Sequence, residues 1–123
     1  MKKIFITGTA GFIGFHLANL LLKEGFTVHG YDGLTSYYDV NLKKVRQDIL
    51  LKNSSFSTTT GLLEDFEKLH TAIKSFKPDI LIHLAAQAGV RYSLENPRAY
   101  IDSNIIGTFN ILEVTQSEKI KHL

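Results

Sequence analysis

Three glycines near the N-terminus have the spacing of a loop that binds phosphate groups. Gly8, Gly11 and Gly14 lie in the run GTAGFIG, between a β-branched and aromatic run, Lys3–Thr7, and a stretch with apolar residues at helical spacing. In such a loop the first glycine permits a tight turn, the second lets backbone approach a pyrophosphate, and the third lets helix and strand pack closely. The unpaired N–H groups of the helix N-terminus then face the phosphates. The pattern predicts a dinucleotide site.

An acidic residue closes the second expected strand, Thr27–Tyr31. This residue is Asp32, and Gly33 follows it. A carboxylate at this place can accept hydrogen bonds from both ribose hydroxyls of NAD, and it repels the 2′-phosphate of NADP. The alternative is that Asp32 only begins a turn with Gly33. The combination of Asp32 with glycines placed between a strand and a helix favours NAD as the cofactor.

The elements that must position these residues alternate between strand and helix periodicity. The expected strands are Lys3–Thr7, Thr27–Tyr31, a weak polar strand over Ser55–Thr60, and an apolar one over Asp79–Ala86. The expected helices carry Phe12, Ile13, Leu17, Leu20 and Leu21; Leu42, Val45 and Ile49 after a possible cap at Asp39; and Phe66, Leu69, Ile73 and Phe76 before Pro78. This order predicts an α/β fold with a parallel sheet, Rossmann-type and doubly wound, truncated after about four strands.

The last expected helix, 97–119, begins at Asn96-Pro97, with Asn as N-cap and Pro at the first helical position. It carries apolar residues on two sides, Ile101, Ile105 and Leu112 on one and Tyr100 and Ile111 on the other. One side can face the sheet, and the other needs a second helix or a partner chain. A further strand is expected to begin at about His122-Leu123. We therefore expect self-association through this helix or through an open sheet edge.

Composition narrows the class of protein. The chain has 123 residues, 44% of them apolar, and a net charge of +2, which is typical of one soluble domain spanning 1–123. The absence of cysteine excludes disulfides and thiolate sites and suits a cytoplasmic location. Dispersed Lys and Arg residues give little support for a nucleic-acid surface, and no apolar run is long enough for a membrane span. No metal site is expected, because His29 and His70 have no paired acid at useful spacing.

Two longer motifs carry a family resemblance. The runs ITGTAGFIGFHLA and HLAAQAGVRYSLENP, followed by YIDSNIIGTFNILE, resemble the extended short-chain dehydrogenase/reductase family, in its NAD-dependent epimerase/dehydratase branch. The motifs AGVRYSLENP and YYDVNLK are most similar to those of UDP-glucuronate 4-epimerases and related nucleotide-sugar epimerases of cell-surface polysaccharide pathways. The resemblance implies tightly bound NAD and reversible oxidation of a sugar nucleotide at C4 by hydride transfer.

The resemblance also implies roles for individual residues. Cofactor contacts fall on the glycine loop and its surroundings, namely Gly8, Gly11, Phe12, Ile13, Gly14, Asp32 and Gly33, and on the backbone of Leu84, Ala85 and Ala86. Asn104 matches a helix asparagine that supports the active site. The resemblance implies catalytic residues downstream of Leu123, so none is assigned within the chain: each of its five tyrosines lacks a lysine four positions later, the residues there being Thr35, Asn41, Leu42, Asn96 and Asn104.

Two positions depart from the branch. It usually has Asn after the ribose-binding Asp, where this chain has Gly33, and it often has Gly-Asp-Leu where this chain has Gly61-Leu62-Leu63. Leu62 cannot accept a hydrogen bond from adenine through its side chain. Both changes are expected to weaken the affinity for the cofactor.

The remaining polar candidates have weaker support. Arg91 either contacts the anionic groups of a sugar nucleotide or is a solvated loop cation. His83 is expected to be a packed, hydrogen-bonded strand histidine, and His16 to be structural or partly exposed. The Tyr37-Tyr38 pair packs near adenine or, as we favour, anchors its loop. Ser93 is expected in a loop with no base beside it.

Rival functions are a 4,6-dehydratase or reductase of the same branch, and a non-catalytic module that binds NAD. The nucleotide-sugar substrate is expected only in a full-length enzyme.

Overall fold

The computed structural model describes residues 2–35 and 39–123 as an α/β fold with one parallel sheet. Its strands are β1 (Lys3–Thr7), β2 (Thr27–Asp32), β3 (Phe56–Thr60) and β4 (Ile80–His83), in the order β3-β2-β1-β4. Its helical segments are α1 (Phe12–Lys23), α2 (Val40–Leu51), α3 (Phe66–Phe76), α4 (Val90–Glu95), α5 (Pro97–Tyr100), a π-helical segment η1 (Ile101–Ile106) and α6 (Gly107–Ser117). The predicted parallel, doubly wound sheet is confirmed.

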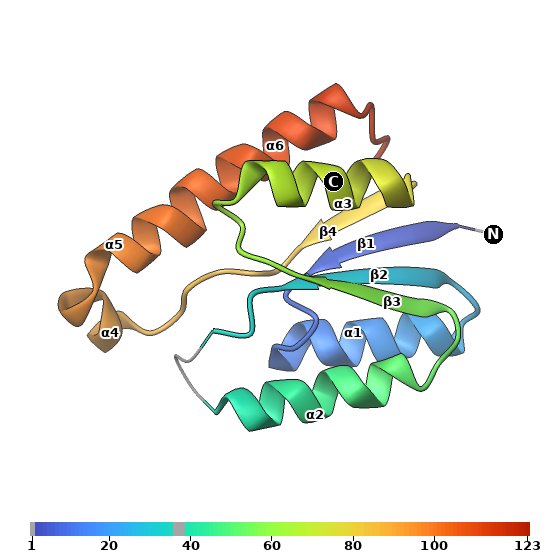
Figure 1. Cartoon of the computed structure of the whole chain (residues 1–123), viewed down its shortest axis with the longest axis horizontal. Coiled ribbons are helices and arrows are strands. Elements are labelled where there is room, and N and C mark those ends of the chain that lie inside the picture. The colour runs from blue at the N-terminus through green and yellow to red at the C-terminus, as the bar shows by residue number, and fades with distance from the viewer. Residues whose placement is uncertain (1, 36–38) are drawn as a thin grey trace.

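Helices cover both faces of the sheet (Figure 1), with α1 and α2 on one side and α3 and α6 on the other. Strand alternation explains this arrangement, because successive side chains point to opposite faces. Ile4 and Ile6 pack in one buried cluster with residues of α1 and α2, and Phe5 packs in the other with residues of α3 and α6. Two apolar layers on a four-stranded sheet fix the carboxyl ends of β1, β2 and β4 beside one another.

The chain end supplies a fifth backbone partner. His122 forms an isolated parallel bridge with Ile80, and the Leu81 amide donates to the His122 carbonyl oxygen at 3.0 Å. A strand was expected to begin at this place, and the structure has there one isolated bridge in the parallel direction. The outer edge of β4 is therefore paired at this point.

The last helix differs from the regular helix that the sequence predicts. It begins as expected, with the Asn96 side chain accepting from the Ala99 amide, but residues 101–106 form π-helical turns. A π turn holds more residues than an α turn, so side chains beyond it lie on a different face from the one that regular spacing gives. Ile111 and Val114 are buried against the sheet, whereas Ile105 and Phe109 are 65% and 60% exposed.

Two other expectations on burial need correction. The predicted apolar face of α2, with Leu42, Val45 and Ile49, is largely exposed, and α2 buries Leu50 and the stem of Lys43 instead. Its N-cap is as predicted, with Asp39 accepting from the Asn41 amide. No helix among the described residues is both long and apolar enough to cross a bilayer.

Candidate functional site

The glycine loop joins β1 to α1 and packs against the chain that leaves β4. Gly8 has φ +86°, a left-handed conformation that residues with a β-carbon rarely adopt. A β-carbon on Gly8 would also lie 3.0 Å from the amide nitrogen of Ala85, and one on Gly14 would overlap the carbonyl oxygen of Gly8. The loop thus has room for backbone alone at the two positions where the glycine pattern requires it.

The N-terminus of α1 differs from those of α2 and α3 in how it is capped. Its N-cap is Gly11, which makes no side-chain hydrogen bond to the first turn, and that turn contains no acidic residue. In α2 and α3 the N-cap aspartates, Asp39 and Asp65, each accept a backbone N–H of the first turn. The first N–H groups of α1 therefore keep their capacity for an external anion, and the positive end of the helix dipole favours one.

The Asp32 carboxylate connects the end of β2 to the glycine loop. Its Oδ2 accepts from the Ala10 amide at 3.0 Å, and its Oδ1 accepts from the Leu34 amide at 2.8 Å. The second bond closes a turn through Gly33, which was the alternative role considered for Asp32. These bonds leave further acceptor capacity on both carboxylate oxygens, so the turn does not exclude the predicted ribose contact.

Two cations of α2 bind the turn after Asp32 and the glycine loop, and no sequence pattern had indicated them. Lys43 is buried, and its Nζ donates to the carbonyl oxygen of Thr35 at 2.8 Å. Burial lowers the pKa of Lys43, while the charge of Asp32 acts in the opposite direction. Arg46 donates through Nη1 to the Ala10 carbonyl oxygen at 3.1 Å. These bonds tie α2 to both loops of the site.

The segment after β4 was predicted as strand to Ala86, but the strand ends at His83. The cause is the buried hydroxyl of Thr7, whose Oγ1 accepts from the amides of Leu84 and Ala85 at 3.0 and 3.1 Å. These bonds turn the chain away from the sheet. The backbone of 84–86 therefore lies as an irregular segment beside Gly8.

The next residue of this segment is held by the π-helical part of the last helix. Asn104 makes a two-way contact with the backbone of Gln87: its Oδ1 accepts the amide at 2.7 Å, and its Nδ2 donates to the carbonyl oxygen at 3.0 Å. This pair of hydrogen bonds fixes the backbone at Gln87, and a neutral amide does not ionise, so the contact suits a positioning role. The supporting role that the resemblance implies for Asn104 stays a prediction, and this contact is its structural basis.

A single cavity gathers most of the predicted cofactor residues. Its lining includes Gly8, Gly11, Asp32, Gly33, Leu84, Ala85 and Ala86, and also residues that the sequence did not single out as contacts: Tyr31, Thr35, Lys43, Gly61, Leu62, Leu63, Glu64, Gln87 and Ser103. Gly14 lies buried beneath the loop, while Phe12 and Ile13 are exposed at the start of α1. Arg91 is exposed on α4 and does not line this cavity. Residues such as Thr35 and Ser103 have no distinctive spacing, so only the fold reveals them.

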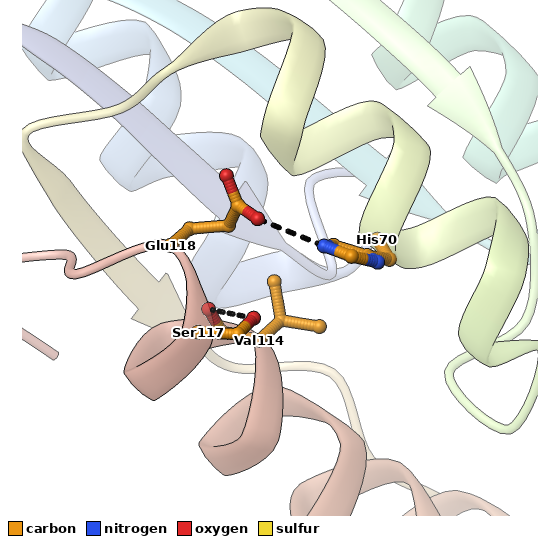
Figure 2. Close-up of polar contacts among 4 residues, drawn as sticks. All are labelled: His70, Val114, Ser117 and Glu118. Atoms are coloured by element: carbon orange, nitrogen blue, oxygen red, sulfur yellow. Dashed lines mark hydrogen bonds and ion pairs between the residues drawn. The ribbon is translucent and has the colours of Figure 1, made fainter.

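The histidines have structural partners. His83 is hydrogen-bonded and partly buried, as predicted, between Thr7 and Thr108, and His16 is exposed. His70 corrects the argument from spacing, because the fold brings it to Glu118, with 2.9 Å between Nε2 and Oε2 (Figure 2). That pair links α3 to the end of α6. Among the described residues no three metal-binding side chains form a group.

Two remaining expectations concern the loops. Ser93 lies on α4 and not in a loop, and its hydroxyl donates to the Val90 carbonyl oxygen. Tyr37 and Tyr38 lie outside the described residues.

The sheet order and flanking helices define a Rossmann-type α/β protein. The chain belongs to the family described as GDP-mannose 4,6 dehydratase, whose model matches residues 5–122. The predicted membership of the epimerase/dehydratase branch is thereby confirmed.

Individual relatives show which enzymes of this family the chain is similar to. The chain is 53% identical to a probable UDP-glucuronate 4-epimerase of Rhizobium meliloti over 98% of its own length and 36% of the relative's. It is 46% identical to a UDP-glucuronate 4-epimerase of Thermodesulfobacterium geofontis, over 100% of its own length and 38% of the relative's. A solved UDP-glucuronic acid 4-epimerase of Bacillus cereus, in complex with UDP-glucuronic acid and NAD, superimposes with a TM-score of 0.86 at 34% identity, over 98% of this chain and 37% of that one. The chain thus spans little more than a third of these proteins.

Proposed function

We propose that residues 1–123 form the NAD-binding part of a nucleotide-sugar 4-epimerase. The observation that carries the proposal is the bond from the Ala10 amide to Asp32 Oδ2, which joins the glycine loop to the acidic residue. The bond supports the proposal because Gly11, the N-cap of α1, and Asp32 line one cavity. In Rossmann-type sites the helix N-terminus binds the pyrophosphate of a dinucleotide, and the acidic residue after the second strand binds its ribose.

The residues present fit NAD. The glycine loop has no space for a side chain at Gly8 or Gly14, and the first turn of α1 lacks a side-chain cap. Asp32 retains acceptor capacity for the ribose hydroxyls. NAD, when bound, supplies the acceptor and donor of a hydride. The chain's own residues bind and orient it: Thr7 and Asn104 fix the segment 84–87, and Lys43 fixes the turn after Asp32.

The sugar-nucleotide activity is a proposal for the whole protein. The relatives named as UDP-glucuronate 4-epimerases favour epimerisation of a UDP-sugar. The family description favours the rival, a sugar-nucleotide 4,6-dehydratase. A purified full-length protein that interconverts UDP-glucuronic and UDP-galacturonic acid supports the epimerase. Release of a 4-keto-6-deoxy sugar nucleotide, or turnover of neither substrate, contradicts it.

Residues 1–123 alone are proposed to bind NAD without turning over a sugar nucleotide. None of the five tyrosines has a lysine four residues later, so the chain lacks the Tyr-x-x-x-Lys spacing in which an ammonium group promotes proton transfer by a phenol. A measurable epimerase rate from the purified chain would contradict this part of the proposal.

Binding and its location are tested together by nuclear magnetic resonance. Addition of NAD to the purified, isotope-labelled protein should shift the backbone amide signals of residues 8–14 and 84–87. The amides of α3, on the far side of the sheet from α1, serve as the internal control. Shifts confined to α3, or no shifts at all, would contradict a cofactor site at the glycine loop.

The last helix supports a proposal on self-association. Ile101, Ile105, Phe109 and Leu112 are each at least half exposed on it, and large apolar side chains exposed in this number on one helix favour an interface. We expect a mass above 13.8 kDa in light scattering, and a monomer for the double variant I105E/F109E. A monodisperse wild-type monomer at high concentration would contradict the proposal.

A further inference from the structure

The two positions at which the chain departs from its branch are in contact with each other. A β-carbon on Gly33 would lie 2.8 Å from Cδ2 of Leu62, which is closer than carbon atoms pack without overlap. The side chain of Leu62 therefore occupies space that a side chain at position 33 needs. We call Gly33 and Leu62 a matched pair, because a side chain at position 33 would require the exposed tip of Leu62 to move.

The backbone holds Leu62 firmly in this place. The Gly61 amide donates to the carbonyl oxygen of Asp32 at 3.1 Å, and the Tyr31 hydroxyl donates to the carbonyl oxygen of Leu62 at 2.7 Å. Tyr31 is 1% exposed, so the second bond comes from a fixed side chain. Leu62 itself is 44% exposed and lines the cavity beside Asp32 and Gly33. Its side chain therefore lies at the surface of the cavity and outside the two core clusters.

The pair thus makes one end of the proposed cofactor cavity apolar. With phosphates at the start of α1 and ribose on Asp32, the base of a dinucleotide is directed to the cavity wall that continues from Asp32 to Gly33 and Leu62. Neither residue has a side-chain donor or acceptor. We propose, on the basis of the proposed NAD site, that Gly33 and Leu62 hold the purine by apolar contact without reading its 6-amino group. The site then accepts dinucleotides with either adenine or hypoxanthine.

One polar side chain near this wall must be tested separately. Glu64 lines the same cavity, and its Oε1 is a buried oxygen without a hydrogen-bond partner in the described structure. A carboxylate that accepts from the 6-amino group would discriminate against hypoxanthine, because a carbonyl oxygen replaces that amino group and leaves the acceptor unpaired. The variant E64Q therefore distinguishes the apolar pair from a reading carboxylate.

The experiment compares the Kd values of NAD and of nicotinamide hypoxanthine dinucleotide for the purified protein by calorimetry. The proposal expects the two Kd values to agree within about threefold in the wild type and in E64Q. The variant L62D, which introduces an acceptor, should then favour NAD by about tenfold or more. A preference of the wild type for NAD beyond about tenfold overturns the proposal. Loss of that preference in E64Q would show that Glu64 recognises the 6-amino group. An unchanged ratio in L62D also overturns it.

The contact itself is tested by a second pair of variants. G33N should lower thermal stability and NAD affinity because its side chain meets Leu62, and G33N/L62A should recover most of both losses. Additive losses would contradict the matched pair. Failure of the wild type to bind either dinucleotide removes the proposed function itself, whereas binding of NAD with rejection of the hypoxanthine analogue removes only this inference.

Discussion

Thr7 Oγ1 lies 2.8 Å from Nδ1 of His83, at the point where β1 and β4 end side by side. The same hydroxyl accepts from the amides of Leu84 and Ala85. A hydroxyl has two acceptor sites and one proton, so Thr7 must donate that proton to Nδ1. His83 is then neutral, with its proton on Nε2 facing Thr108 Oγ1 at 3.2 Å. Burial lowers the pKa of His83 in agreement with this state.

This relationship predicts the effect of removing one hydroxyl. T7V keeps the β-branched shape but leaves the Ala85 amide without the acceptor that the structure gives it, which should cost about 1–3 kcal/mol of unfolding free energy. NAD affinity should fall with it, because segment 84–87 loses its anchor. T7S, which retains the hydroxyl, is the matched control for urea unfolding and calorimetry. Equal NAD affinity in T7V and the wild type would show that Thr7 does not position the cofactor segment.

The glycine loop predicts a difference between two alanine variants with similar backbone strain. Gly8 and Gly25 both have positive φ, at +86° and +92°, so each alanine should cost roughly 1–2 kcal/mol of stability. Only Gly8 lies against other backbone, since nothing lies within 4 Å of a β-carbon on Gly25. G8A should therefore abolish NAD binding while G25A retains it. The account fails if both variants bind NAD with wild-type Kd.

Lys43 and Lys44 are neighbours on α2 with opposite surroundings. Lys43 is buried with its Nζ on Thr35, whereas Lys44 is exposed. K43M should raise the Kd for NAD by about three- to tenfold, because the turn after Asp32 loses its anchor. K44M removes the same charge from the same helix and should leave the Kd unchanged. An equal rise in both variants would indicate a general effect of charge.

His29 predicts a loss of stability in mild acid. Burial lowers the pKa of His29 from its ordinary value of 6.5 to about 4. Its ring stacks on Phe5 and contacts the hydroxyls of Ser57 and Thr59. Between these two pKa values the unfolded chain binds more protons than the folded one, so stability present above about pH 6.5 is lost as the pH falls toward about 4.

The measurement for His29 is the free energy of unfolding in urea at several pH values across this window. His29 contributes a slope of at most about 1.4 kcal/mol per pH unit, and His83 adds a slope of the same sign. H29Q removes the titrating ring and should flatten the profile. An identical slope in H29Q would mean that the acid sensitivity has another source.

Local patterns were sufficient for the four strands, the first three helices and the glycine loop, because strand and helix periodicity, caps and turn glycines act over a few residues. They failed where a distant group decides the outcome. The Thr7 hydroxyl ends β4 three residues before the apolar run ends, and the π-helical turns rotate the last helix beyond Ile106. The pairing of His70 with Glu118, 48 residues apart, and the contact of Gly33 with Leu62 have no signal in spacing. The cytoplasmic location and the polysaccharide pathway stay predictions.

The selectivity between NAD and NADP is most directly tested by titrating both into the purified wild-type protein by calorimetry. Asp32 faces the proposed ribose position, while Lys43 and Arg46 lie close by with their donors on Thr35 and Ala10. The account predicts tighter binding of NAD by about tenfold or more, because the Asp32 carboxylate repels a 2′-phosphate. Tighter binding of NADP would mean that the two cations receive the phosphate, and it would contradict the role given to Asp32.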